Sequence, residues 1–200
     1  MTDPVIPDSR HLFDLPYASL SSAQRLDLYW PSEGAGPFPV IVSIHGGAFL
    51  GGDKRDDQVR PMLAGLTRGY AVASLNYRLS GEACFPALIH DARAAIRWLR
   101  VNAAEHRLDP TRFAAWGGSA GGYLALMVGL TANRPDLDDP ALGAPGESSA
   151  VQAVVDWFGP TDFLKMDTQL AESGLAPAPG DEHNGPRSPE SLLLGRPITD

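Results

Sequence analysis

The sequence has few of the features that mark secreted, membrane-spanning or redox-active proteins. Its single cysteine, Cys84, excludes an intrachain disulfide, and we interpret it as a buried, unreactive thiol because no partner base lies beside it. No apolar run approaches the ~18–20 residues that a membrane-spanning helix needs. The N-terminus lacks the basic and apolar stretches of a signal peptide, so we expect a cytoplasmic protein.

Basic residues are also scarce. The chain has 16 Lys and Arg against 24 Asp and Glu, which gives a net charge of −8. This balance excludes the basic face by which proteins bind nucleic acid or anionic membranes. With 200 residues, 44% of them hydrophobic and 20% charged, the composition is that of one globular domain with a sizeable core.

Apolar patterning predicts strands separated by helices. Residues 24–30 alternate as a half-exposed strand does, with Leu26 and Leu28 on one face. Nearly continuous apolar runs, typical of buried parallel strands, follow at 39–44, 71–75, 112–116 and 151–158. Helical spacing is found at 59–66, where Gly69 provides a C-cap, at 88–99 and from 120 onward. This alternation predicts an α/β fold with a mainly parallel sheet and helices on both faces.

The chain is predicted to form one domain, residues 1–200, in two parts. Strand and helix patterns occupy residues 12–169, which we expect to form the core. Residues 170–200 are rich in proline and glycine, and an irregular loop segment is expected there. Chemistry in such folds lies beyond the carboxyl ends of the strands, so the segments after those ends are the ones to inspect.

A G-x-S-x-G motif at 117–121 follows the predicted strand 112–116 and precedes a helix. Such a tight strand-to-helix reversal strains the backbone of its central residue, Ser119, and requires small neighbours, which are present. The turn lifts the hydroxyl above the sheet, and the helix N-terminus directs its positive end toward it. We therefore predict that Ser119 is a nucleophile; the alternative is a glycine-rich turn with a bystander serine.

The segment 45–49, HGGAF, ends the first buried strand. Backbone N–H groups aimed at the oxyanion of a reacting ester can contribute ~10²–10³-fold in rate per donor. The predicted donors are the N–H groups of Gly47 and Ala48, joined by that of Ala120 beside the nucleophile. A catalytic-base role for His45 is the alternative, but its position directly before the glycines favours a role in holding the loop.

Together these motifs resemble the α/β-hydrolase carboxylesterases, in particular the bacterial esterase and feruloyl-esterase-like group. The resemblance covers nearly the whole chain and rests on HGGAF (45–49), NYR (76–78), GGSAGG (117–122), DWFGPTD (156–162) and SPESLLLG (188–195). It implies an α/β-hydrolase fold, Ser119 as nucleophile and the oxyanion donors named above. It also implies small acyl or aromatic-acyl esters as substrates, with no cofactor or metal.

The resemblance places an acid and then a histidine after the nucleophile, on later strands, but the only histidine after Ser119 is His183. We interpret His183 as a surface or loop-anchoring residue, and Asp156 and Asp162 as capping residues rather than a displaced triad acid. We therefore expect a C-terminally incomplete α/β-hydrolase with weak or no activity alone. Its strand at 151–158 is expected to form an apolar edge open to homo-oligomerisation.

Three hypotheses remain open. The first is a serine carboxylesterase, present as part of a longer enzyme, that hydrolyses small-molecule esters through an acyl-serine. The second is a compact esterase whose triad uses His183 and an aspartate from 156–162. The third is a non-catalytic binding protein that retains the hydrolase cradle. Candidates to line an acyl pocket are Phe49, Tyr77 and Trp157, with core packing as the alternative for each.

Overall fold

The structure is a computed structural model that describes residues 10–178, 180 and 182–200; the N-terminal stretch predicted to lack a signal peptide lies outside these residues, within 1–9. In chain order the elements are β1 (Arg10–Pro16), β2 (Arg25–Trp30), β3 (Phe38–Ile44), η1 (Asp57–Val59), α1 (Arg60–Leu63), η2 (Ala64–Arg68), β4 (Ala71–Leu75), α2 (Ala87–Val101), β5 (Leu108–Gly118), α3 (Ala120–Leu130), η3 (Pro135–Leu137), β6 (Ala153–Trp157), η4 (Phe163–Lys165), α4 (Met166–Glu172) and α5 (Pro189–Leu194). None of the helices in the described ranges combines the length and apolar character needed to span a bilayer.

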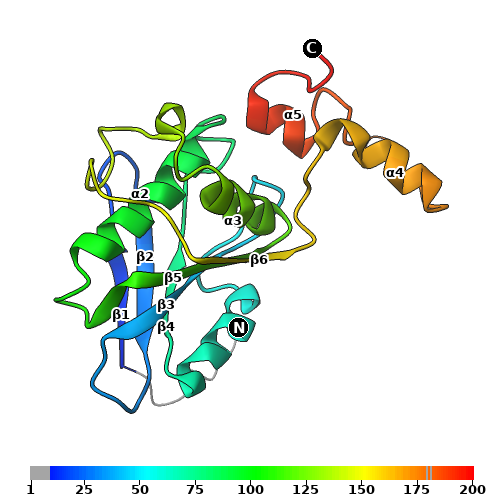
Figure 1. Cartoon of the computed structure of the whole chain (residues 1–200). Helices are drawn as coiled ribbons and strands as arrows, with labels where there is room; N and C mark the ends of the chain where they lie inside the picture. The colour runs from blue at the N-terminus through cyan, green and yellow to red at the C-terminus, as the bar shows by residue number, and fades with distance from the viewer. Residues whose placement is uncertain (1–9, 179, 181) are drawn as a thin grey trace.

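One six-stranded sheet organises the chain, in the order β1-β2-β4-β3-β5-β6 (Figure 1). The four strands β4, β3, β5 and β6 run parallel, whereas β2 joins β4, and β1 joins β2, in antiparallel orientation. The register pairs Ile44 with Gly117 and Gly118 with Trp157. The mainly parallel sheet predicted from the apolar runs is therefore confirmed, and the loops that follow β3, β5 and β6 meet at one edge.

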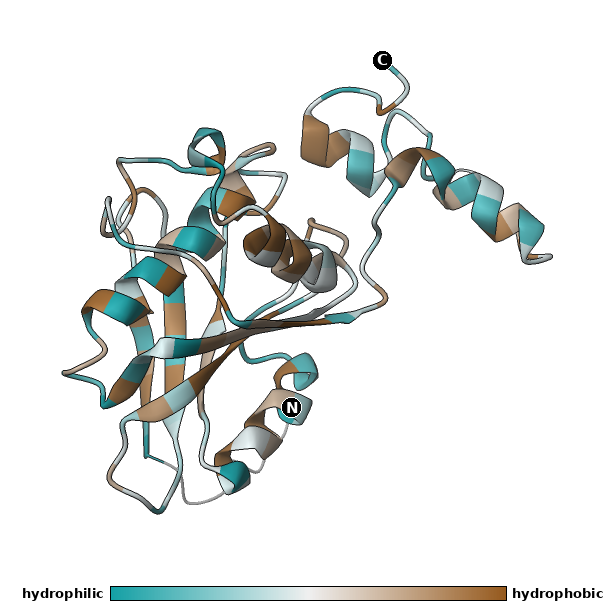
Figure 2. Ribbon diagram, in the orientation of Figure 1, coloured by the Kyte–Doolittle hydropathy of each residue, from teal (hydrophilic) through white to brown (hydrophobic). Residues whose placement is uncertain are grey.

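Helices cover both faces of the sheet, and each face has its own apolar core. α2 and α3 lie on one face (Figure 1), where Leu88, Ile96 and Leu124 are buried in the larger core. On the opposite face Met62 packs with Val72 in a second cluster. Figure 2 shows that α3 is hydrophobic around much of its circumference, as expected for a helix that packs on the sheet and against α2 beside it.

Three segments differ from the prediction. β1 was not predicted, because most of its residues are exposed and it is held by antiparallel pairing with β2. The helix expected at 59–66 is instead one α-helical turn, α1, flanked by the 3-10 segments η1 and η2, although Gly69 ends it at φ 80° as predicted. Residues 170–200 contain the end of α4 and all of α5, so the expectation of a wholly irregular loop was wrong.

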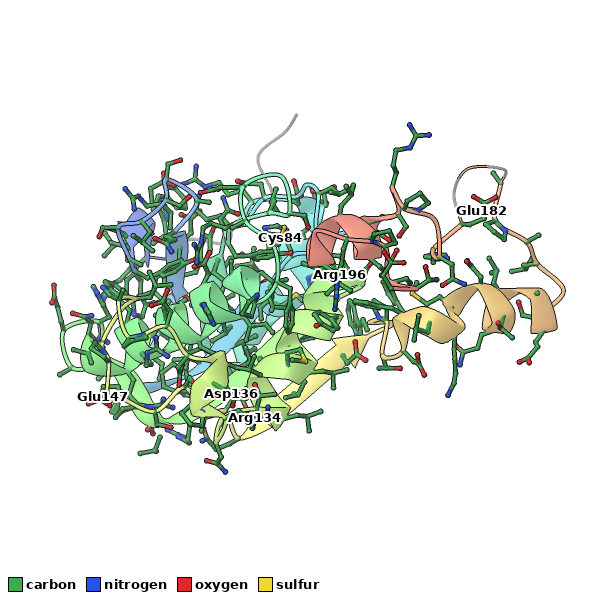
Figure 3. The ribbon with its side chains drawn as sticks, turned by 90° about the horizontal axis from the view of Figure 1, so that it is seen from above. Cys84, Arg134, Asp136, Glu147, Glu182 and Arg196 are labelled. Carbon is green, nitrogen blue, oxygen red and sulfur yellow. The ribbon has the colours of Figure 1, made fainter. Side chains whose placement is uncertain are left out.

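The segment after β6 leaves the sheet and comes back at α5 to the loop before α2. In Figure 1, α4 extends away from the sheet, while Leu193 of α5 is buried in the larger core. The Phe85 N–H donates to the carbonyl of Leu193 at 2.7 Å. Cys84 lies beside α5 (Figure 3), with its sulfur 3.8 Å from the Leu192 carbonyl. Cys84 is exposed, so the predicted burial of this thiol was wrong: it lies in the loop before α2 and not in the core.

A buried carboxylate fixes the segment that follows β4. Asp91 of α2 is fully buried, and its oxygens accept hydrogen bonds from the Gln24 amide and the Arg78 guanidinium, each at 2.8 Å. The backbone N–H of Arg78 also donates to Asp91, at 2.9 Å. Because each carboxylate oxygen has donors, the buried charge is compensated. The network ties α2 to the residue before β2 and to the loop after β4.

Candidate active site

Ser119 lies at the sharp turn between β5 and α3. Its φ and ψ are 55° and −125°, a conformation that residues other than glycine adopt only under strain. The Ser119 N–H donates to the Trp157 carbonyl at 2.8 Å, and the Ser119 carbonyl accepts from the Tyr123 N–H at 3.0 Å. The backbone on both sides of the hydroxyl is thereby fixed, in the geometry expected of a nucleophile elbow.

Glycine is required around this turn because three backbone segments approach each other closely. A Cβ at Gly121 would lie 2.1 Å from the Ile44 carbonyl oxygen, and one at Gly117 would lie 2.2 Å from the Gly121 oxygen. A Cβ at Gly122 would lie 2.2 Å from the Asp156 carboxylate. The small residues of the motif therefore let the elbow pack directly against the carboxyl ends of β3 and β6.

The loop after β3 runs beside the elbow. Gly47, Ala48 and Phe49 have positive φ values of 126°, 53° and 63°, so the chain turns sharply at the end of the strand. A Cβ at Gly46 would lie 3.3 Å from the Cβ of Ser119. The predicted oxyanion loop and the predicted nucleophile are thus in contact, because β3 and β5 are adjacent parallel strands.

The N–H groups predicted as oxyanion donors are available. Among the residues that the structure describes, none accepts a hydrogen bond from the backbone N–H of Gly47 or Ala48. Ala120 is the first residue of α3, so its N–H has no acceptor within the helix. The positive end of α3 and two free amides of the loop therefore converge on the region around Ser119.

His45 is buried at the start of this loop. Its Nδ1 lies 2.9 Å from the Gly46 carbonyl oxygen, and its ring stacks on Tyr77 with the centroids 4.5 Å apart. The Tyr77 hydroxyl donates to the His45 carbonyl at 2.8 Å. Burial lowers the pKa of His45, which favours the neutral imidazole. These contacts hold the loop in place, which is the role preferred for His45 over that of a base.

A cavity of about 320 Å³ lies against Ser119. Its walls come from the loop after β3, the elbow, the segment after β6, α4 and the start of α5. The residues that line it include Ala48, Phe49, Ser119, Ala120, Phe158 and Glu190. The C-terminal segment therefore supplies one wall of the cavity that contains the candidate nucleophile.

Only one of the three residues predicted to line an acyl pocket does so. Phe49 lines the cavity and packs edge to face on Tyr123, with the centroids 5.5 Å apart. Tyr77 is buried under the loop and lines a different hollow, because its hydroxyl is used by the loop backbone. Trp157 packs against Trp116, with centroids 5.1 Å apart, and not on the cavity. Its neighbour Phe158, which follows the end of β6 and has a φ of 49°, lines the cavity instead.

His183 and Asp167 form a pair at the same cavity, with His183 in its lining. The His183 Nδ1 lies 2.8 Å from Asp167 Oδ1, and the backbone N–H groups of His183 and Asn184 donate to the same carboxylate at 3.0 and 2.9 Å. Burial raises the pKa of Asp167, but these three donors outweigh it and the pKa lies below its ordinary value. Three contacts to one carboxylate anchor the loop. No sequence pattern predicts this pairing.

The two aspartates after β6 have partners of their own. Asp156 accepts from the Gly159 N–H at 2.8 Å and so caps the turn after the strand. Asp162 forms an ion pair with Lys165 at 3.1 Å. Neither is hydrogen-bonded to His183, so the pairing of His183 with an aspartate from 156–162 was wrong: the carboxylate bonded to His183 is that of Asp167.

A family profile covers most of the chain. The BD-FAE family matches residues 26–200. The chain belongs to the BD-FAE family. Relatives of this BD-FAE chain include the probable carboxylic ester hydrolase LipM of Mycobacterium tuberculosis, 33% identical over 166 residues that make up 82% of this chain. The esterase LipQ of the same organism is 34% identical over 158 residues, or 77% of this chain.

Solved structures agree with the family. The bifunctional GH43-CE of Bacteroides eggerthii superposes with a TM-score of 0.80 at 34% identity, covering 93% of this BD-FAE chain and 24% of that protein. A truncated form of a carbohydrate esterase from gut microbiota has a TM-score of 0.79 at 34% identity, with coverage of 96% and 68%. The predicted α/β-hydrolase fold and carboxylic ester hydrolase family are confirmed. The chain spans 38% of LipM and 36% of LipQ.

Proposed function

We propose that this chain acts on carboxylic esters, with Ser119 as the nucleophile and the N–H groups of Gly47, Ala48 and Ala120 as oxyanion donors. One observation carries the proposal: Ser119 lies on a strained turn in contact with a loop in which the N–H groups of Gly47 and Ala48 have no acceptor among the described residues. The relatives named above are ester hydrolases, which is the chemistry that this arrangement supports.

In the proposed reaction Ser119 Oγ attacks the carbonyl carbon of the ester, and the carbonyl electron pair moves onto its oxygen. The three N–H groups stabilise this oxyanion, each by ~10²–10³-fold in rate. When the carbonyl re-forms, the alkoxide leaves and takes up the serine proton, and the acyl group remains on Ser119. Water then attacks the acyl-serine, releases the carboxylic acid and regenerates the hydroxyl.

Removal of the serine proton is the step for which the described residues provide least. None of them forms a hydrogen bond with Ser119 Oγ, and a serine hydroxyl without a base is a weak nucleophile at neutral pH. An oxyanion hole and binding alone retain ~10³–10⁴-fold acceleration over water. We therefore expect slow turnover of activated esters. The absence of a hydrogen-bonded base at Ser119 Oγ among these residues also favours a second candidate function, in which the protein binds a ligand in this cavity without catalysis.

Fluorophosphonate labelling with peptide mass spectrometry separates the two candidates. The esterase proposal expects an adduct on the peptide that contains Ser119 and release of nitrophenol from 4-nitrophenyl acetate above the rate in buffer. Absence of the adduct together with nitrophenol release at the buffer rate would contradict the esterase proposal and favour binding without catalysis.

Replacing His183 by alanine is expected to leave most of the nitrophenyl acetate activity. His183 is held by Asp167 through its ring and its backbone, which is the arrangement of a loop anchor. A general base would contribute ~10²–10⁴-fold, and we expect a loss well below that range. Initial rates of the wild type and the variant measure the effect, with amide exchange of residues 182–184 as the readout of loop anchoring.

Two further variants complete this experiment. Asp167→Asn removes the charge that orients His183, whereas Asp162→Asn, whose carboxylate pairs with Lys165, is the matched control from the same cavity. A ~10²–10⁴-fold loss shared by His183→Ala and Asp167→Asn but absent from the control would contradict the anchor role. It would make Asp167 and His183 the acid and base of a compact triad.

A further inference from the structure

Among the residues that the structure describes, Glu190 of α5 is the one in the cavity wall with a buried carboxylate oxygen that has no partner. The residue is 4% exposed, and its Oε2 is fully buried without a hydrogen bond. Across residues 10–178, 180 and 182–200, buried polar side-chain atoms without a partner occur in Ser80, His90, Arg97, Arg100, Trp116, Asn184 and Glu190. Of these residues only Glu190 lines the cavity next to Ser119, and only Glu190 is a carboxylate.

The position of Glu190 is not explained by the folding of α5. The helix is capped by Ser188, whose Oγ accepts from the Ser191 N–H at 3.1 Å, and Glu190 makes no capping hydrogen bond. The other carboxylate in the cavity wall, that of Asp162, is paired with Lys165, and His183 is paired with Asp167. The other ionisable groups in the cavity wall thus have partners of opposite charge or hydrogen-bond partners, whereas Glu190 has neither among the described residues.

A buried carboxylate without donors destabilises the fold, because the desolvation of the charge is not compensated. Groups left unsatisfied in this way are expected where a ligand completes them. We infer that Glu190 accepts a hydrogen bond from a hydroxyl group of the substrate and so selects esters that carry a free hydroxyl close to the ester bond. This assignment deepens the proposed function, since it rests on Ser119 being the reacting residue of the same cavity.

A hydroxyl fits this site better than an ammonium group. An ammonium brings three N–H donors and a full positive charge that is costly to desolvate, whereas a hydroxyl brings one donor and is neutral. Glu190 is the only unpaired carboxylate among the described residues that line the cavity. A single donor therefore meets a single acceptor, and the remaining lining, which includes Phe49 and Phe158, accommodates the apolar part of the ester.

Binding to the Ser119→Ala protein tests the inference without any need for turnover. 2-Hydroxyethyl acetate and n-propyl acetate are matched in length and differ by a hydroxyl in place of a methyl group. Their dissociation constants can be measured by ligand-observed NMR. A hydrogen bond to a charged group is expected to favour the hydroxyl ester about 10-fold or more. Glu190→Leu in the same background is expected to abolish the preference, and Glu190→Gln to leave an intermediate one.

Asp162→Asn is the control, because it removes a carboxylate of the same cavity that already has a partner, and it is expected to keep the preference. A preference that survives Glu190→Leu, or that is absent at the outset, overturns the assignment. So does tighter binding of β-alanine ethyl ester, which carries an ammonium group, than of the hydroxyl ester. A positive result here with no labelling of Ser119 in the wild type would reject the proposed catalysis but keep the binding site.

Thermal stability supplies a second readout that separates binding from a structural role. Because the carboxylate has no partner in the described residues, Glu190→Gln removes an uncompensated charge and is expected to raise the melting temperature of the ligand-free protein by about 2–4 °C. A side chain that holds the fold together would lower it on replacement. A fall in melting temperature with an unchanged ester preference overturns the inference.

Discussion

Replacing Ser119 by alanine is expected to abolish the fluorophosphonate adduct and to lower nitrophenyl acetate hydrolysis by at least ~10²-fold. The reason is that Ser119 Oγ is the only atom proposed to form the acyl intermediate, so its loss leaves oxyanion binding without a nucleophile. The drop should remain well below the ~10⁶-fold measured when a complete serine triad loses its nucleophile, because the wild-type hydroxyl has no hydrogen-bonded base among the described residues. Intact-mass spectrometry and initial rates measure both effects.

The matched control for this experiment is Ser148→Ala, which removes an exposed serine hydroxyl away from the cavity. Its adduct and rate are expected to equal those of the wild type. Retention of the adduct in Ser119→Ala would mean that another residue is the nucleophile, and the proposed function would fail. Melting temperatures of the two variants should agree closely, since neither substitution creates a cavity in the core.

Alanine at Gly117 is expected to have the largest effect on stability. Its Cβ would lie 2.2 Å from the Gly121 oxygen, 2.3 Å from the Gly121 carbonyl carbon and 2.8 Å from the Ile44 oxygen. All three atoms belong to backbone that is fixed by the elbow and by β3, so no side chain can move aside. Overpacking usually costs ~1–3 kcal/mol, and we expect a destabilisation of about 3 kcal/mol or more here. Urea unfolding followed by circular dichroism measures it.

The neighbouring glycine provides the control. A Cβ at Gly118 would meet the Phe158 ring at 3.5 Å, an ordinary van der Waals contact, and no backbone atom closer than 3.8 Å. Gly118→Ala is therefore expected to change the free energy of unfolding by less than ~1 kcal/mol. An equal loss of unfolding free energy in both variants would show that backbone propensity, and not the close approach at Gly117, explains the glycines of the motif.

The sequence predicts the sheet and the elbow well because both depend on local rules. Four apolar runs identify β3, β4, β5 and β6. β3 and β4 are buried almost throughout, as such runs predict, whereas β6 at the edge of the sheet is partly exposed. The residues around Ser119 must be small because the backbone of the turn approaches other backbone closely, so the motif alone predicts the conformation of the turn. The sharp turn at Gly47 and Ala48 is predictable for the same reason, because small residues are needed where the backbone approaches itself closely.

Features that depend on tertiary contacts were less predictable. β1 is largely exposed and owes its conformation to β2, which no pattern in its own residues records. The pairing of His183 with Asp167 joins residues 16 positions apart across an irregular loop. α5 was predictable in principle, because Ser188 followed by Pro189 is a typical start of a helix. The surrounding prolines and glycines led instead to the prediction of an irregular loop. The cavity is lined by Phe158 and not by Trp157, because the chain leaves the strand at Trp157 and turns at Phe158, where φ is 49°.

The attachment of α5 to the loop before α2 has a consequence for cleavage of the chain. The buried side chain of Leu193 and the hydrogen bond from Phe85 to its carbonyl hold the end of the chain without relying on the peptide bonds that precede it. A protease that cuts near the exposed Leu175 would therefore leave a nicked protein whose two pieces stay associated. Peptide continuity between α4 and α5 is then dispensable, and Glu190 would keep its place in the cavity wall after the cut.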